Sequence, residues 1–149
     1  MDLDKTLNML LVTLFQDIMD IEEKSLINDE FKDITANDMH VIEAIGIGKP
    51  QTSSSVAKRL SITMGTLTKA IDGLAKCAYV NRERSEEDKR LVLLSLTDKG
   101  KKAYYHHQKF HKDMIDAVIA QLDPDETQIL TKSLGSLAGY LKDNKETVE

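Results

Sequence analysis

The stretch SSSVAKRLSITMGTLTKAIDGLAKCAYVNRERSEEDKRLVLLSL, residues 53–96, decides the fold. Its opening serine run offers hydroxyls that can cap a short helix over residues 56–60. After a short break a second helix is expected, because Leu67, Ile71 and Leu74 recur on one helical face. Two short helices separated in this way predict a helix-turn-helix motif.

The second half of the same stretch predicts a β-hairpin. Residues 79–84 and 90–96 are two β-prone runs, and they enclose the charged segment 85–89. A hairpin that directly follows a helix-turn-helix is a wing. The expected fold is therefore mainly α (α+β): a winged helix-turn-helix with additional helices at both chain ends.

Longer helices are expected around this module. Apolar residues at spacings of three and four predict a first helix over residues 3–27. Thr35 and Asp38 form the pattern of a capping box at the start of a second helix. Thr97 can cap a further helix, and Pro124 lies in the first turn of the last one.

Charge is distributed unevenly along the chain. The net charge is −5, yet residues 51–102 carry 11 Lys and Arg against 6 Asp and Glu, a local balance of +5, which leaves −10 for the rest. Phosphate binding requires local positive charge. The basic module within an acidic frame therefore favours nucleic-acid binding by the helix-turn-helix and the wing.

Several other classes are disfavoured. The first residues lack the basic head of a signal peptide and apolar runs are short, so we expect a cytoplasmic protein with no membrane partner. The single cysteine, Cys77, is expected to be a buried structural thiol. No phosphate-binding glycine loop, G-x-S-x-G elbow or H-E-x-x-H motif is present, so no enzyme and no required cofactor are expected.

These segments resemble the MarR family of transcriptional regulators. The resemblance rests on residues 56–60, 63–74 and 88–90, where the wing carries D-x-R, and on the L-T-x-x-G motif at 96–100. One departure is Ala78, where the family usually has glycine, and we expect a modest change of turn geometry there. The resemblance implies a repressor that binds double-stranded operator DNA. The implied DNA-binding residues are Ser54, Thr63, Gly65, Thr66, Thr68, Lys69, Arg82, Arg84, Asp88, Lys89 and Arg90.

The whole chain, 1–149, is expected to form one MarR-type unit. Residues 35–97 would be the DNA-binding region, and residues 1–30 and 98–149 would be dimerisation helices. Their apolar stripes are larger than one small module can cover, so burial against a second copy is expected. A homodimer would place two recognition helices one DNA turn apart.

Within the family, the chain resembles the repressors of bacterial fatty-acid synthesis. The shared segments include residues 21–23, 31–34 and 110–112, which lie outside the helix-turn-helix and the wing. This resemblance implies acylated acyl carrier protein as a corepressor partner and a long acyl chain as the effector. An apolar slot for that chain could be lined by Phe15, Met19, Phe31, Ile34, Met39 and Ile42. Ordinary core is the alternative interpretation of each of these residues.

A second alternative concerns zinc. His107 and His111 are four residues apart on one helical face, a spacing that suits two zinc ligands. Together with Glu22 and His40 they resemble the ligand set of zinc-responsive members of the family. Hydrogen bonding between histidines and carboxylates of neighbouring helices would explain the same residues without a metal.

Overall fold

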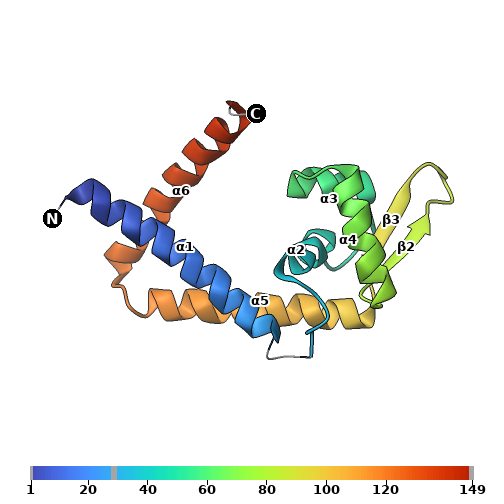
Figure 1. Cartoon of the computed structure of the whole chain (residues 1–149), viewed down its shortest axis with the longest axis horizontal. Helices are drawn as coiled ribbons and strands as arrows, with labels where there is room; N and C mark the ends of the chain where they lie inside the picture. The colour runs from blue at the N-terminus through green and yellow to red at the C-terminus, as the bar shows by residue number, and fades with distance from the viewer. Residues whose placement is uncertain (1, 28–29, 148–149) are drawn as a thin grey trace. The chain divides into compact units, whose positions relative to one another are not determined.

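The computed structural model describes residues 2–27 and 30–147, which form six helices and a small antiparallel sheet (Figure 1). The elements follow the expected order, with one short strand added before the helix-turn-helix. They are α1 (Leu3–Ile27), α2 (Ala36–Ile45), β1 (Gln51–Thr52), α3 (Ser53–Leu60), α4 (Met64–Lys76), β2 (Val80–Arg84), β3 (Val92–Leu96), α5 (Asp98–Ile119) and α6 (Pro124–Thr147).

The chain separates into two compact units. The first extends through Phe110 and contains the helix-turn-helix, the wing, α1 and the first half of α5. The second begins at His111 and contains the rest of α5 and α6.

The core of the first unit lies under the helix-turn-helix. The capping box is confirmed: Thr35 Oγ1 accepts from the Asp38 amide at 3.1 Å, and Asp38 accepts from the Thr35 amide at 3.0 Å. This cap fixes the start of α2, whose Met39 and Ile42 are fully buried. The other core side chains include Val56, Leu67, Ile71, Leu74, Tyr79 and Leu94. Apolar burial at these positions holds α2, α3, α4 and the sheet together.

The sheet has the strand order β1-β3-β2. Strands β2 and β3 form the expected wing hairpin, in which Val80 pairs with Leu96 and Arg84 with Val92. The two-residue strand β1 was not expected; it pairs Gln51 with Leu94 and Thr52 with Leu93. Thr52 also caps α3 by accepting from the Ser55 amide, so this pairing ties the start of α3 to the wing.

Helix α4 ends in a Schellman motif. The Tyr79 amide donates to the Leu74 carbonyl at 2.8 Å, and the Ala78 amide donates to the Ala75 carbonyl at 3.1 Å. Ala78 has φ +66°, in the left-handed region that favours glycine. The expected change of turn geometry is therefore not observed: alanine keeps the geometry typical of glycine and bears its conformational cost instead.

Gly100 allows α5 to pack closely against the chain that leaves α4. An added Cβ at this position would lie 2.1 Å from the carbonyl oxygen of Tyr79. The same contact region holds Thr97, whose hydroxyl donates to the Ala78 carbonyl at 2.6 Å and accepts from the Gly100 amide at 3.0 Å. The L-T-x-x-G motif thus fixes the start of α5 against the exit of α4.

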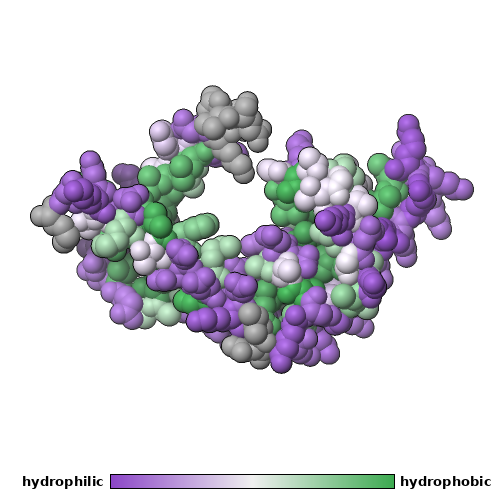
Figure 2. Space-filling model, in the orientation of Figure 1, coloured by the Kyte–Doolittle hydropathy of each residue, from purple (hydrophilic) through white to green (hydrophobic). Residues whose placement is uncertain are grey.

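The terminal helices expose most of their apolar residues. Among the side chains of α1 that the structure describes, the buried ones are Glu22 and Leu26 near its end, while the predicted stripe from Leu3 to Ile21 is exposed. In the second unit, α6 exposes Ile129, Leu134 and Leu137, and Figure 2 shows hydrophobic side chains along this helix. Among the described residues, no helix is both long and apolar enough to cross a membrane.

Candidate nucleic-acid interface

Helix α4 buries one face and presents the other to solvent. Leu67, Ile71 and Leu74 are at most 2% exposed, whereas Thr66, Thr68 and Lys69 are exposed. The helix therefore offers two hydroxyls and the Lys69 ammonium group to solvent, which suits contacts to bases and phosphates.

Hydrogen bonds at the start of α4 assign different roles to its threonines. Thr63 is the N-cap: its hydroxyl accepts from the Thr66 amide at 3.1 Å and donates to the Thr66 hydroxyl at 2.9 Å. The Thr68 hydroxyl donates to the Met64 carbonyl at 2.8 Å, so its lone pairs remain for a donor on DNA. Gly65 is exposed, and the nearest atom to an added Cβ would be 4.0 Å away.

The wing tip holds Arg90 in a defined orientation. Arg90 donates to both carboxylate oxygens of Asp88, from Nε at 3.1 Å and from a terminal nitrogen at 3.2 Å, and its own amide donates to Asp88 at 3.1 Å. These bonds hold the pKa of Asp88 below its usual value. The Arg90 side chain is nevertheless 89% exposed. Asp88 thus orients the guanidinium without covering it.

Two other basic residues of the wing, Arg82 and Arg84, make polar contacts within the protein. Arg82 pairs with Asp72, an ion pair that connects β2 to α4. Arg84 donates to the Lys89 carbonyl at 2.9 Å and so closes the wing tip. Lys89 is exposed, and Figure 2 shows polar side chains covering the wing. Arg82, one of the implied DNA-binding residues, therefore also joins the wing to the recognition helix.

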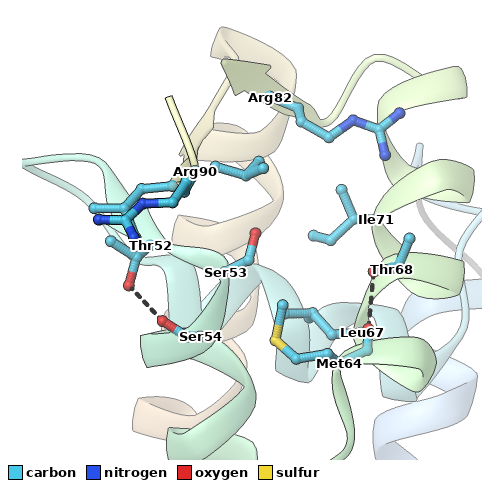
Figure 3. A pocket seen from close by; sticks show the side chains of 11 residues that line it. Thr52, Ser53, Ser54, Met64, Leu67, Thr68, Ile71, Arg82 and Arg90 are labelled. Atoms are coloured by element: carbon cyan, nitrogen blue, oxygen red, sulfur yellow. Dashed lines mark hydrogen bonds between the residues drawn. The ribbon is translucent and has the colours of Figure 1, made fainter. Parts of the chain in front are cut away.

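A hollow of about 250 Å³ lies between α3, α4 and the wing (Figure 3). It brings together Ser54, Thr68, Arg82 and Arg90 of the expected DNA-binding set. Ser54 hydrogen-bonds to Thr52 at 3.3 Å at its edge. Hydroxyls from two helices and two arginines from the wing thus face one concave surface. The other seven members of the set lie outside the lining of this hollow: Thr63, Gly65, Thr66, Lys69, Arg84, Asp88 and Lys89.

The residues expected to line an acyl slot fall into two groups. Phe31, Ile34, Met39 and Ile42 belong to the buried core of the first unit. Phe15 is 68% exposed and Met19 is 38% exposed on α1. The structure thus gathers four of the six residues and leaves two on the surface. Cys77, expected to be buried, is half-buried at the end of α4.

Three helices of the first unit bring titratable residues together at a second place. His107 Nε2 lies 3.1 Å from Glu22 Oε1 and 2.9 Å from Glu43 Oε1. His40 lies 3.6 Å from Glu43 and 4.0 Å from Glu22. Glu22 and His107 are buried. His111 follows one turn later in α5, within the second unit.

Glu43 was not among the residues singled out from the sequence. Its spacing of three from His40 on an apolar helix would have indicated it, because residues three apart share a helical face. Donor atoms of His40, Glu43 and His107 all lie within 4.8 Å of one another. Two imidazoles and a carboxylate are a donor set that zinc accepts.

The reading helix, the capped α3 and the arginine-bearing wing together define a winged helix-turn-helix DNA-binding protein. The family model described as "Transcriptional regulator SarA/Rot" matches residues 22–106. The chain belongs to this family of transcriptional regulators, and its fold is that of the MarR regulators. It is a DNA-binding regulator and not an enzyme, as the sequence predicted.

Solved structures of similar proteins cover nearly the whole chain. FabT of Streptococcus pneumoniae, solved in complex with DNA, is 37% identical with a TM-score of 0.89, over 93% of this chain and 97% of that one. Wild-type MarR of E. coli, solved in its apo form, is 27% identical with a TM-score of 0.66, over 92% and 97%. MepR of S. aureus, also solved with DNA, is 20% identical with a TM-score of 0.71 and shows the fold alone, over 89% and 95%.

Curated relatives match over shorter regions. The HTH-type transcriptional repressor YetL of Bacillus subtilis is 34% identical over 84 residues, which are 56% of this chain and 50% of that protein. The regulator PchR of the same organism is 28% identical over 107 residues, 70% of this chain and 63% of PchR. The chain thus spans between half and two thirds of the length of these relatives.

Proposed function

We propose that the protein is a homodimeric transcriptional repressor that binds operator DNA with α4 and the wing. The carrying observation is the exposed, oriented Arg90 beside the open hydroxyl face of α4. An arginine held in this way can enter a narrow minor groove while α4 lies in the major groove. The exposed apolar residues of α1 and of α6 support a second copy as the partner that covers them.

The regulated genes are, in this proposal, those of fatty-acid synthesis. Support comes from the similarity to S. pneumoniae FabT, which extends over 93% of the chain and therefore includes segments outside the helix-turn-helix and the wing. The resemblance to fatty-acid-synthesis repressors described above also includes such segments. Acylated acyl carrier protein would act as corepressor by raising the affinity for the operator.

An acyl chain would meet the two groups of slot residues in succession. Phe15 and Met19 are exposed on α1, whereas Phe31, Ile34 and Met39 are packed in the core. The chain would have to separate these buried side chains in order to enter between them. Burial of its methylene groups, worth about 0.8 kcal/mol each, would offset that cost.

Operator affinity measured with two forms of acyl carrier protein tests this proposal. DNA sites are first recovered by genome-wide capture, and a duplex from upstream of fatty-acid-synthesis genes is titrated with the protein. We expect acylated carrier protein to lower the Kd and the unacylated form to leave it unchanged. Equal effects of both forms, or capture only at unrelated genes, would defeat the acyl-sensor function while leaving DNA binding intact.

Zinc is the alternative effector, and the clustering of His40, Glu43 and His107 favours it. Ligand atoms bound tetrahedrally at about 2.1 Å lie about 3.4 Å apart, close to the separations of 2.9–4.0 Å found between these histidines and the glutamates. Zinc bound by these three residues would join α2 and α5. The same distances also suit direct hydrogen bonds and ion pairs without a metal.

Metal analysis and DNA titration distinguish the two effectors. The purified protein is titrated with operator DNA in chelator and in zinc, alongside Glu43→Gln and the control Glu23→Gln on the exposed side of α1. Regulation by zinc requires a zinc-dependent change in Kd that Glu43→Gln reduces and Glu23→Gln retains. A Kd that is the same in chelator and in zinc excludes zinc as the effector.

A further inference from the structure

Three side chains connect the exit of α4 to two other parts of the first unit. The Tyr79 hydroxyl donates to Asp33 Oδ1 at 2.5 Å, and Lys99 Nζ donates to Asp33 Oδ2 at 3.3 Å. Asp33 lies in the segment between α1 and α2, Tyr79 follows α4, and Lys99 lies in the first turn of α5. One carboxylate therefore binds residues 46 and 66 positions away in sequence.

Lys99 adds two contacts to the same group. Its ammonium lies 4.3 Å from the centre of the Tyr79 ring and donates to the Cys77 carbonyl at 3.0 Å. Cys77 is the C-cap of α4, where a positive charge complements the negative end of the helix dipole. The cation thus contacts the end of the recognition helix, the ring that follows it and the carboxylate.

The protonation states support a persistent arrangement. The hydrogen bond from Tyr79, with that from Lys99, lowers the pKa of Asp33, so this group is a carboxylate at neutral pH. Burial, followed by the bond to Asp33, raises the pKa of Tyr79, so its hydroxyl keeps the proton that it donates. The Tyr79 residue is fully buried and its ring packs near Phe31, with 6.4 Å between centroids.

The orientation of α4 depends on how its C-terminal end is held. The helix has 13 residues, so it is about 20 Å long at about 1.5 Å per residue. A rotation of about 5° at its exit would move the first turn by about 1.7 Å, about three times the tolerance of about 0.5 Å for a functional constellation. Thr66 and Thr68, near that first turn, would then lose their register with the bases.

We propose that Asp33, Tyr79 and Lys99 form an exit latch that positions α4 for operator recognition. The latch residues are positioning residues, because they act through the orientation of the helix and need not touch DNA. The inference rests on DNA reading by α4. It extends the reading site to the segment between α1 and α2, which lies outside the helix-turn-helix and the wing.

A specificity measurement tests the latch. The full-length protein is titrated with two duplexes: one from a genomic site recovered by DNA capture, and one of scrambled sequence with the same length and composition. Tyr79→Phe keeps the buried ring and the net charge but removes the hydroxyl. Asp33→Asn removes the carboxylate, and Glu30→Gln, three residues earlier at an exposed position, is the matched charge control.

We expect Tyr79→Phe and Asp33→Asn each to raise the Kd for the captured site by about threefold to tenfold, with less than about a twofold change for the scrambled duplex. The double variant should lose about as much as the larger single loss, because both changes act on the hydrogen bond between Tyr79 and Asp33, while Asp33→Asn also removes the ion pair with Lys99. Asp33→Asn also reduces the net charge from −5 to −4, which alone would strengthen binding to both duplexes. Glu30→Gln should show only that small electrostatic gain.

The ratio of the two affinities separates positioning from folding. A purely structural role would reduce the fraction of active protein and raise the apparent Kd for both duplexes equally. The ratio of the two Kd values would then be unchanged in the variants, and this result would overturn the latch. If the wild type itself does not discriminate between the duplexes, sequence reading by α4 fails, and this outcome differs from failure of the latch alone.

Discussion

Replacing Ala78 with glycine should stabilise the protein without weakening DNA binding. A left-handed conformation costs an L-residue about 1–2 kcal/mol, and glycine avoids this cost. Glycine also destabilises the folded state by about 0.4–1 kcal/mol, because it gives the unfolded chain more conformational freedom. Ala78 is exposed at φ +66°, so its methyl group contributes no core packing. The expected net gain is therefore about 0.5–1 kcal/mol.

Urea unfolding followed by circular dichroism, at a fixed protein concentration, measures this gain. The midpoint should rise with an unchanged slope, and Tm should increase by about 1–4 °C. Ala75→Gly, three residues earlier within α4, is the matched control and should lose about 0.5–1 kcal/mol. The left-handed strain argument is refuted if the two glycine substitutions change stability in the same direction.

Three further predictions concern close packing, helix capping and the wing. Gly100→Ala should destabilise the fold by about 2 kcal/mol or more, because the added Cβ would lie 2.1 Å from the Tyr79 carbonyl oxygen. The control is Gly73→Ala, whose added Cβ has no atom within 4 Å, and thermal unfolding should show it to be neutral or stabilising. Thr63→Ala should cost about 1 kcal/mol through loss of the α4 N-cap, and equal stability of Thr63→Ala and Thr63→Ser would contradict that role. The pKa of Asp88 is lowered in the folded wing, so the stabilisation from its bonds with Arg90 is present above the pKa of the unfolded chain and is lost as pH falls through the lower folded value. Carboxyl NMR should therefore show a higher pKa of Asp88 in Arg90→Gln than in the wild type. An unchanged pKa would exclude the Arg90 side chain as the cause of the lowered value.

Local sequence signals were sufficient for most of the secondary structure. The apolar period predicted α1, and the pairing of Thr35 with Asp38 marked the start of α2. Thr52 caps α3 so that the helix begins at Ser53, earlier than the apolar residues alone indicate. Strand β1 was missed because two residues are too short to show alternation, and its existence depends on pairing with β3.

Tertiary relations were harder to predict. The bond between Asp33 and Tyr79 joins residues 46 positions apart, and no local pattern marks it. The apolar residues assigned to an acyl slot are alike in type, yet Phe31 is 3% exposed and Phe15 is 68% exposed. Burial of that kind is decided by which faces pack together, and the spacing along one helix does not contain that information.

Among the expected DNA-binding residues, too, local contacts were easier to predict than tertiary ones. The resemblance singled out Asp88 and Arg90 through the D-x-R motif, and the structure shows that Asp88 orients the Arg90 guanidinium. The partner of Arg82 was not predictable, because Asp72 lies on α4 and meets β2 only after the wing has folded against it.

Operator titration of Arg90→Ala tests the central claim most directly. The variant is compared with the wild type and with Lys32→Ala, which removes one exposed positive charge between α1 and α2. DNA reading by α4 and the wing predicts at least about a tenfold rise in Kd for Arg90→Ala, with unchanged circular dichroism and melting temperature, and less than about a twofold rise for Lys32→Ala. An Arg90→Ala protein that is folded and binds the operator as tightly as the wild type would contradict it.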